Sequence, residues 1–151
     1  MATLLLNESG AAPGAAVEIT LAAWREGARP EAGRFALVIP NTEDVRALGE
    51  AVAAFDAVIL EFPDFRDGRA YSQARLLRER LGFAGEIRAR GAVLPDQALF
   101  MARAGFTALE IGERDAAPFE DALSAFSVFY QPAADAVLPA HGLRARLREA
   151  A

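Results

Sequence analysis

The chain contains no cysteine and no lysine, and its only histidine is His141, near the C-terminus. Without cysteine it cannot form a disulfide, a thiolate nucleophile, a cysteine-ligated zinc site or a cysteine-held iron–sulfur cluster. Without lysine it cannot form a Schiff base or supply the lysine of a phosphate-binding P-loop. One histidine is too few for histidine-rich metal sites and for most Ser–His or Cys–His relays. A G-x-G-x-x-G turn, the usual fingerprint of dinucleotide binding, is also missing.

Long hydrophobic runs and positive charge are scarce as well. No apolar run approaches the ~20 residues that a membrane-spanning helix needs. The 151 residues include 16 arginines and 21 acidic residues, and the net charge of −5 gives no overall drive toward nucleic acid or a membrane surface. We therefore expect a soluble cytoplasmic protein that binds neither nucleic acid nor membrane.

Hydrophobic residues make up 53% of the chain, which is enough to bury a core in one domain of ordinary size. Apolar runs bounded by turn residues predict strands, and spacings of three and four residues predict helices. The first third is ambiguous, because residues from Val17 onward fit either a strand or a helical face. Strands are predicted at 2–6, 35–39, 57–62, 86–93 and 107–111, and helices at 42–55, 71–81, 95–104 and 118–126.

Helix, short turn and strand recur three times, each time with a phenylalanine in the turn, at Phe55, Phe83 and Phe106. Each phenylalanine is expected to fill the joint between a helix end and the sheet. This alternation predicts a single α/β domain of successive β–α units, with a mostly parallel open sheet and helices packed on it. A partial β/α barrel is the alternative. Residues 1–131 would form the domain, and residues 132–151 a loosely attached tail, a short exposed helix or a partner-binding arm.

The loop after the second predicted buried strand, residues 61–73, is the richest candidate site. In open α/β sheets ligands bind beyond the carboxyl ends of the strands, where such loops converge. Arginine supplies planar bidentate donors for a carboxylate, phosphate or sulfur oxyanion. A well-capped loop with internal Asp–Arg pairs is the competing interpretation. The candidate residues here are Asp64, Arg66, Asp67, Arg69, Tyr71 and Ser72.

The next strand and helix start supply four more candidates, Arg88, Arg90, Asp96 and Gln97. The two arginines share one face of their strand, because successive side chains point to opposite faces. They either lie in solvent on an edge strand or point toward a pocket or partner. Asp96 and Gln97 are ordinary helix starters that could also orient a ligand hydroxyl.

Aromatic residues give two further expectations. Tyr71 begins a helix and is expected to be a core aromatic with its hydroxyl at the rim, or else a weak general acid. Four aromatic residues late in the chain predict part of the core or, alternatively, a homodimer seam: Phe119, Phe126, Phe129 and Tyr130.

The string Phe62-Pro63-Asp64-Phe65-Arg66-Asp67-Gly68-Arg69 resembles a bacterial family of unknown function, and the likeness covers about residues 55–106 well. Members are commonly described as oxidoreductases of assimilatory sulfite reduction, because their genes neighbour that of sulfite reductase. This chain departs from the family pattern at Ala92, Pro95 and Ala104. A cysteine is frequent in the family at the position of Ala104, so a catalytic thiol is not expected here.

The resemblance implies a pathway and leaves open whether the chain is an enzyme. An oxidoreductase of this composition would need a borrowed redox centre. The leading hypothesis is an accessory or small binding protein of sulfite or sulfate assimilation, which binds a small oxyanion or sulfite reductase through its arginine-rich loop. The first alternative is an oxidoreductase that binds flavin or NADPH through Asp67, Tyr71 and Asp96. The second is a structural homo-oligomer.

Overall fold

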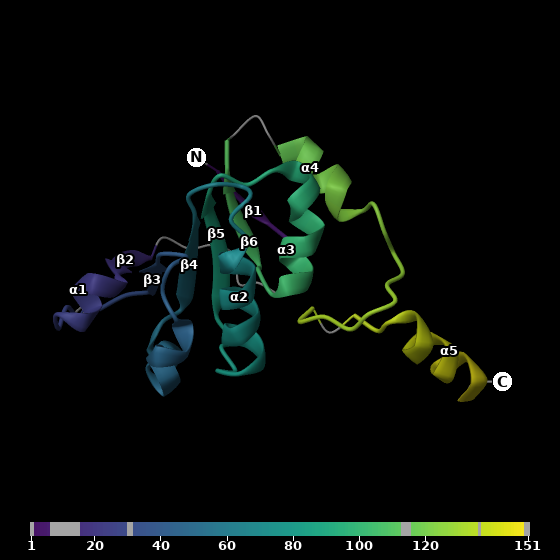
Figure 1. Cartoon of the computed structure of the whole chain (residues 1–151), viewed down its shortest axis with the longest axis horizontal. Coiled ribbons are helices and arrows are strands. Elements are labelled where there is room, and N and C mark those ends of the chain that lie inside the picture. Colours follow the sequence, from purple (N-terminus) through teal and green to yellow (C-terminus); the bar gives the residue numbers. More distant parts are fainter. Residues whose placement is uncertain (1, 7–15, 30–31, 113–115, 136, 150–151) are drawn as a thin grey trace.

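A computed structural model describes residues 2–6, 16–29, 32–112, 116–135 and 137–149. Their strands form one open six-stranded sheet in the order β1-β6-β5-β4-β3-β2, with helices packed on it (Figure 1). Strands β2 to β6 run parallel and β1 pairs antiparallel with β6. The predicted α/β class and the mostly parallel open sheet are confirmed. The strands are β1 (Ala2–Leu5), β2 (Val17–Thr20), β3 (Phe35–Ile39), β4 (Ala57–Phe62), β5 (Glu86–Gly91) and β6 (Ala108–Ile111).

The connecting helices are close to the predicted segments, with two differences in type, because the segment after β3 and the first turn of the predicted helix at 95–104 are 3₁₀ rather than α. The segment after β3 is a ten-residue 3₁₀ helix that begins after Asp44 rather than Thr42, and Gly49, at φ +53°, kinks it. Its predicted inner face is confirmed, since Val45, Leu48 and Val52 are buried. The helices are α1 (Leu21–Arg25), η1 (Val45–Ala54), α2 (Arg69–Glu79), η2 (Pro95–Gln97), α3 (Ala98–Ala104), α4 (Ala116–Leu123) and α5 (Ala140–Glu149). None of these helices is both long and apolar enough to cross a bilayer.

Strands β2 to β6 follow one another across the sheet in chain order, so every crossover steps in the same direction. Right-handed crossovers that all step the same way place their helices on the same face of a sheet. The main core accordingly lies on that face, where strand residues such as Leu37, Val58 and Ile87 meet the helices. On the opposite face a small apolar cluster of Ala36, Val38, Ala57 and Ile59 lies beside charged residues.

The three repeated phenylalanines fill the joints between helix ends and sheet, as predicted. Phe55, Phe83 and Phe106 are all buried. The Arg78 guanidinium reinforces two of these joints, because it donates hydrogen bonds to the carbonyls of Phe83 and Gly105 at 2.6 and 3.0 Å. The joints are therefore held by packed rings and by one charged donor that satisfies loop carbonyls.

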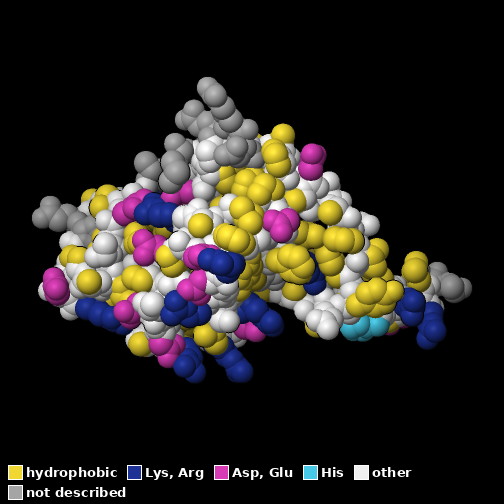
Figure 2. Space-filling view, turned by 45° about the horizontal axis from the view of Figure 1, so that its top comes forward, with side chains coloured by type: hydrophobic (Ala, Val, Ile, Leu, Met, Phe, Trp, Pro, Cys, Tyr) yellow, Lys and Arg dark blue, Asp and Glu magenta, His cyan; other side chains and the backbone are white. Residues whose placement is uncertain are grey.

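The prediction of a core role for the late aromatic residues is wrong for two of the four. Phe119 is buried, but Phe126 and Tyr130 are 67% and 82% exposed, because the chain leaves the helical layer after Leu123. Figure 2 shows hydrophobic side chains gathered toward the side where the chain continues to α5, whereas acidic and basic side chains mix on the other side.

Candidate functional site

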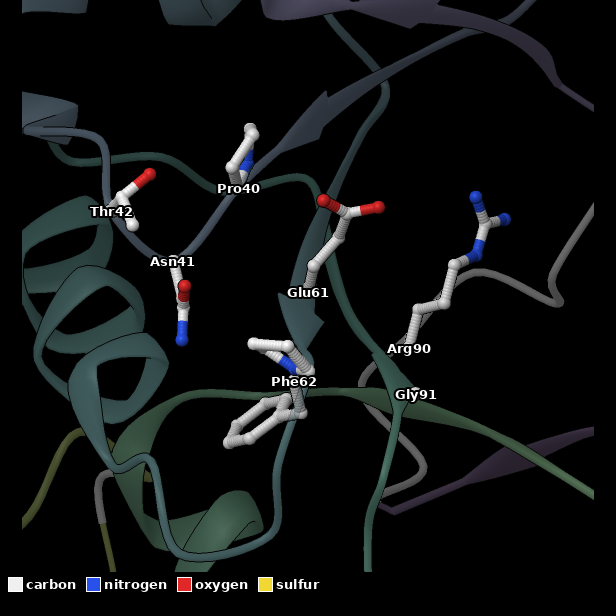
Figure 3. Close-up of a pocket in the computed structure, with 8 residues that line it drawn as sticks. Pro40, Asn41, Thr42, Glu61, Phe62, Arg90 and Gly91 are labelled. Carbon is white, nitrogen blue, oxygen red and sulfur yellow. The ribbon is translucent and has the colours of Figure 1, made fainter.

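The carboxyl ends of β3, β4 and β5 enclose a cavity of about 370 Å³ (Figure 3). The cavity lies where parallel α/β sheets place their ligand sites, because the loops that follow the strands converge there. Its wall consists of residues 40–42, 61–63, Arg90 and Gly91. Gly91 closes the floor in a left-handed conformation with φ +112°, and Ala92 N–H donates to the Phe62 carbonyl at 2.7 Å.

Two polar side chains in this wall have unused hydrogen-bonding capacity toward the residues that the structure describes. The Glu61 carboxylate lies between Pro40 and Arg90 in Figure 3, without an ion pair in the described part of the chain. Asn41 is only 5% exposed, and its Nδ2 has no partner within hydrogen-bonding distance. The Asn41 amide nevertheless contributes to lowering the pKa of Asp67 and so faces the loop after β4. The cavity and that loop are therefore neighbouring parts of one edge of the sheet.

Three Asp-x-Arg pairs surround this edge in the same local geometry. Each aspartate accepts the backbone N–H of the arginine two residues on, and that arginine returns its Nε and Nη2 hydrogens to the carboxylate. Hydrogen bonds from the arginine lower the pKa of each aspartate, so the pairs stay ionised well into acid. The pairs are Asp44–Arg46 at the start of η1, Asp64–Arg66 in the loop after β4, and Asp67–Arg69 where that loop meets the start of α2.

The outer edge of each of these guanidinium groups remains available. Nη1 of Arg46, Arg66 and Arg69 has no hydrogen-bond partner in the part of the chain that the structure describes. The three side chains are 68%, 76% and 58% exposed. Each arginine is thus held by an acid on one side and presents two or three N–H donors on the other. Such a group can bind a second carboxylate end-on without first losing rotamer freedom.

The predicted residue Gln97 ties this loop to the next one. Its Nε2 donates to the Phe65 carbonyl at 2.8 Å, and its Oε1 accepts the N–H of Leu94 at 3.0 Å. Phe65 is 43% exposed, and the Arg66 guanidinium lies 5.5 Å from its ring centroid. The loop therefore presents an aromatic ring and arginines on a braced backbone.

Tyr71 is the rim aromatic that the sequence predicts. Its ring packs edge-on against Phe62 and Phe106, with centroids 5.5 and 6.1 Å apart. Burial, with a smaller effect of the Asp96 carboxylate, raises the pKa of Tyr71 to about 12 from its usual 10.0. A phenol with this raised pKa is a weaker proton donor than an ordinary tyrosine, which argues against a role as a general acid at neutral pH.

We expect the raised pKa of Tyr71 to appear directly in an alkaline titration. In a Tyr130→Phe variant Tyr71 is the remaining tyrosine, and its tyrosinate absorbance should develop near pH 12 rather than pH 10.0. The unfolded state ionises first, so this group's contribution to folding stability falls as pH rises from 10.0 toward 12. A midpoint at pH 10.0 in the folded protein would contradict the buried position of the phenol.

Arg88 and Arg90 do not lie on an edge strand, so that alternative is wrong. β5 lies between β4 and β6, and the two arginines belong to an ion network on the face opposite the helices. Arg88 pairs with Glu86 at 2.6 Å and with Glu110 at 3.3 Å. Arg90 binds Glu110 at 2.6 Å and reaches across β4 and β3 to Glu18. A buried parallel strand tolerates two arginines here because both are paired.

The network sets the charge state of its carboxylates. Burial alone would raise the pKa of Glu110, but hydrogen bonds from Arg90 and Arg88 outweigh burial and lower it. A hydrogen bond from Arg90 likewise lowers the pKa of Glu18, and both acids raise the pKa of Arg90. All three groups are therefore charged at neutral pH.

The structure thus divides the ten predicted site residues. Tyr71, Asp96 and Gln97 lie next to the loop of Asp64–Arg69, Ser72 lies on the first turns of α2, and Arg88 and Arg90 extend over the other face of the sheet. Sequence reasoning missed Asn41, Glu61 and the pair Asp44–Arg46. The repeated Asp-x-Arg spacing could have revealed that pair.

Within the described residues no group of three or more acidic or histidine side chains is arranged to hold a metal ion.

The protein belongs to a bacterial α/β family. Residues 36–141, more than two thirds of the chain, match the family described as "bacterial protein of unknown function (DUF934)". No curated protein and no solved structure shows significant similarity to the chain. The match begins in β3 and includes the cavity, both loop Asp-x-Arg pairs and the first residues of α5.

Proposed function

We propose that the chain is an accessory protein of assimilatory sulfite reduction that binds an acidic surface of sulfite reductase through the edge formed by its Asp-x-Arg pairs. The observation that supports this binding mode is the geometry of the pairs. Each arginine is fixed by its own aspartate and directs unused N–H donors outward. The pathway itself rests on the resemblance given above.

The pairs favour a protein partner over a small free oxyanion. Each pair is neutral, so the loop offers little net positive charge to attract a lone anion from solution. A protein surface can add contacts that a free anion cannot, and exposed Phe65 beside Arg66 provides an aromatic and arginine combination that is enriched where proteins bind one another. Preorganised side chains also lose less entropy on binding.

The test compares binding of the purified protein and its variants to the sulfite reductase of the same organism, by surface-based kinetics at two salt concentrations. We expect the double variant Arg66→Ala/Arg69→Ala to weaken binding at least tenfold, because removing two interfacial arginines costs roughly 1 kcal/mol or more each. The matched control is Arg34→Ala, which removes an ion-paired arginine just before β3, at the opposite end of the sheet from the Asp-x-Arg pairs. It should leave binding unchanged.

Three outcomes would overturn this proposal. One is no binding of the parent protein to the reductase, and another is equal loss in the loop variant and the Arg34→Ala control. The third is tight binding of sulfite alone that the loop variant abolishes, which would identify a small-oxyanion site instead. Retention of FMN or NADPH by the purified protein, visible in its absorption spectrum, would favour the oxidoreductase alternative and direct mutagenesis to Asp67, Tyr71 and Asp96.

A further inference from the structure

Helix α5 projects away from the sheet and its helical layer and leaves its apolar side uncovered (Figure 1). None of its residues is buried, and Leu147 is 71% exposed. Leu143 lies four residues earlier and so one turn away on the same face, which Arg144 and Arg146 flank on its two sides. An amphipathic helix with an uncovered leucine face is typical of an element that docks into a groove.

The same chain carries a groove of about 500 Å³ between α3 and residues 129–133, with Tyr71 and Arg75 of α2 also in its lining. Phe100, 70% exposed, and Tyr130, 82% exposed, provide its apolar surface. Hydrophobic side chains gather on this side of the molecule in Figure 2. Large exposed aromatic side chains that share one groove mark a contact surface more often than an ordinary stretch of protein exterior.

Arg103 holds the groove open in its present shape. Its guanidinium lies 3.7 Å from the ring centroid of Phe129, donates to the carbonyl of Gln131 at 2.7 Å and pairs with Asp135 at 2.9 Å. The carbonyl of Arg103 accepts the N–H of Ala134 at 3.0 Å. The segment that forms one wall is therefore fixed to α3, and the groove is preformed.

The start of α5 is fixed beside this groove, and the helix leads away from it. Ala140 N–H donates to the Phe129 carbonyl at 2.7 Å, so the first residue of α5 is held at the groove wall. From that anchor the helix extends outward (Figure 1). Leu143 and Leu147 therefore reach a neighbouring molecule more readily than the groove of their own chain.

The net charges of α5 and of the rest of the chain are opposite in sign, and the two arginines that line the groove, Arg75 and Arg103, are each paired with an acid of their own chain. α5 has three arginines and one glutamate, and so a net charge of +2. Because the whole chain has a net charge of −5, the residues outside α5 together carry −7. A positively charged helix is attracted to the acidic body of another copy, which raises the rate of encounter and helps select the partner.

We propose that the protein forms a reciprocal dimer in which α5 of each copy lays Leu143 and Leu147 into the groove of Phe100 and Tyr130 on the other copy. Both contacts are identical and are related by a twofold axis, as in an exchange of equivalent elements between protomers. The docking is independent of the Asp-x-Arg edge, which lies at the ends of β3 and β4 rather than on α3.

The test measures the native mass of the full chain by analytical ultracentrifugation over a range of concentrations. We expect the parent to be a dimer, and we expect Leu143→Asp/Leu147→Asp and, separately, Phe100→Asp to raise the dimer dissociation constant at least tenfold, roughly the effect of losing a buried anchor. The control Val17→Asp places the same charge at another exposed apolar position, 53% exposed, and should leave the mass unchanged.

Mixing the two variants gives the decisive result. An equimolar mixture of the α5 variant and the Phe100→Asp variant retains one intact helix and one intact groove in each mixed pair, so dimer should reappear at concentrations where each variant alone is a monomer. A monomeric parent, dimers that survive in either variant, or a mixture that stays monomeric would each overturn the reciprocal arrangement. Circular dichroism of both variants verifies that they are folded.

Discussion

Replacing Arg90 by methionine should destabilise the fold by roughly 3 kcal/mol, the usual cost of removing one partner from a buried ion pair. Arg90 is the residue that joins the two ends of the network, because it binds Glu110 on the neighbouring strand and Glu18 three strands away. Without it Glu110, which is 9% exposed, keeps, among the described residues, the longer ion pair with Arg88 at 3.3 Å. Urea denaturation at neutral pH measures the loss.

Two controls distinguish an uncompensated charge from loss of packing. The double variant Arg90→Met/Glu110→Met also removes the Glu110 carboxylate that has lost its main partner, so it should be more stable than Arg90→Met alone. Acid provides the second control. The lowered pKa values of Glu110 and Glu18 contribute stability above pH 4.5 that is lost as pH falls through the folded-state values, so the difference between parent and Arg90→Met should shrink in acid. Equal stability of parent and Arg90→Met at neutral pH would show that the network contributes nothing.

This network also shows where sequence reasoning succeeds and where it ends. The alternation of Arg88 and Arg90 correctly places both side chains on one face of a strand. The position of that strand within the sheet is a tertiary property, which depends on partners distant in the sequence. Glu18 lies 72 residues before Arg90 and Glu110 lies 20 residues after it. No local pattern links these three residues, so the edge position was a reasonable but wrong interpretation.

The strands themselves could be predicted well, for a local reason. Phe35–Ile39 is a continuous apolar run and Ala57–Phe62 is an apolar run interrupted by Glu61. Each is followed by a proline, and the structure has strands with those bounds. The predicted helix at 42–55 differs because its type depends on the kink at Gly49, which the apolar spacing does not reveal. Phe126 and Tyr130 were expected in the core because they are aromatic. An aromatic side chain is buried only where its segment folds back against the core, and this segment does not.

The candidate site was located by topology and incompletely described by residue type. The loop after β4 does lie at the ligand edge of the sheet, as the rule for open α/β sheets predicts. Its arginines and aspartates were recognised, and their internal pairing is the competing interpretation that the sequence left open. Asn41 escaped notice because a lone asparagine after a strand is an ordinary turn residue, and only its burial distinguishes it.

Gly91→Ala should be among the most damaging single substitutions in the chain, since two separate effects coincide there. The residue has φ +112°, which side chains disfavour, and a Cβ would lie 2.3 Å from the Phe62 carbonyl oxygen. That oxygen belongs to backbone fixed in the sheet by pairing of β4 and β5, so it cannot move aside cheaply. The main chain at the floor of the cavity can approach β4 this closely only without a side chain.

Gly33→Ala is a matched control, because Gly33 has the same φ of +112° but its Cβ would meet no heavy atom of the described residues within 4 Å. Gly33→Ala should cost about 1 kcal/mol, the strain of the backbone conformation alone. Gly91→Ala should cost a further ~2 kcal/mol or more through the clash, by analogy with overpacked cores. Thermal and urea unfolding of both variants measure the difference. Equal losses would mean that β5 can separate from Phe62 without cost, and the floor of the cavity would then be adaptable rather than fixed.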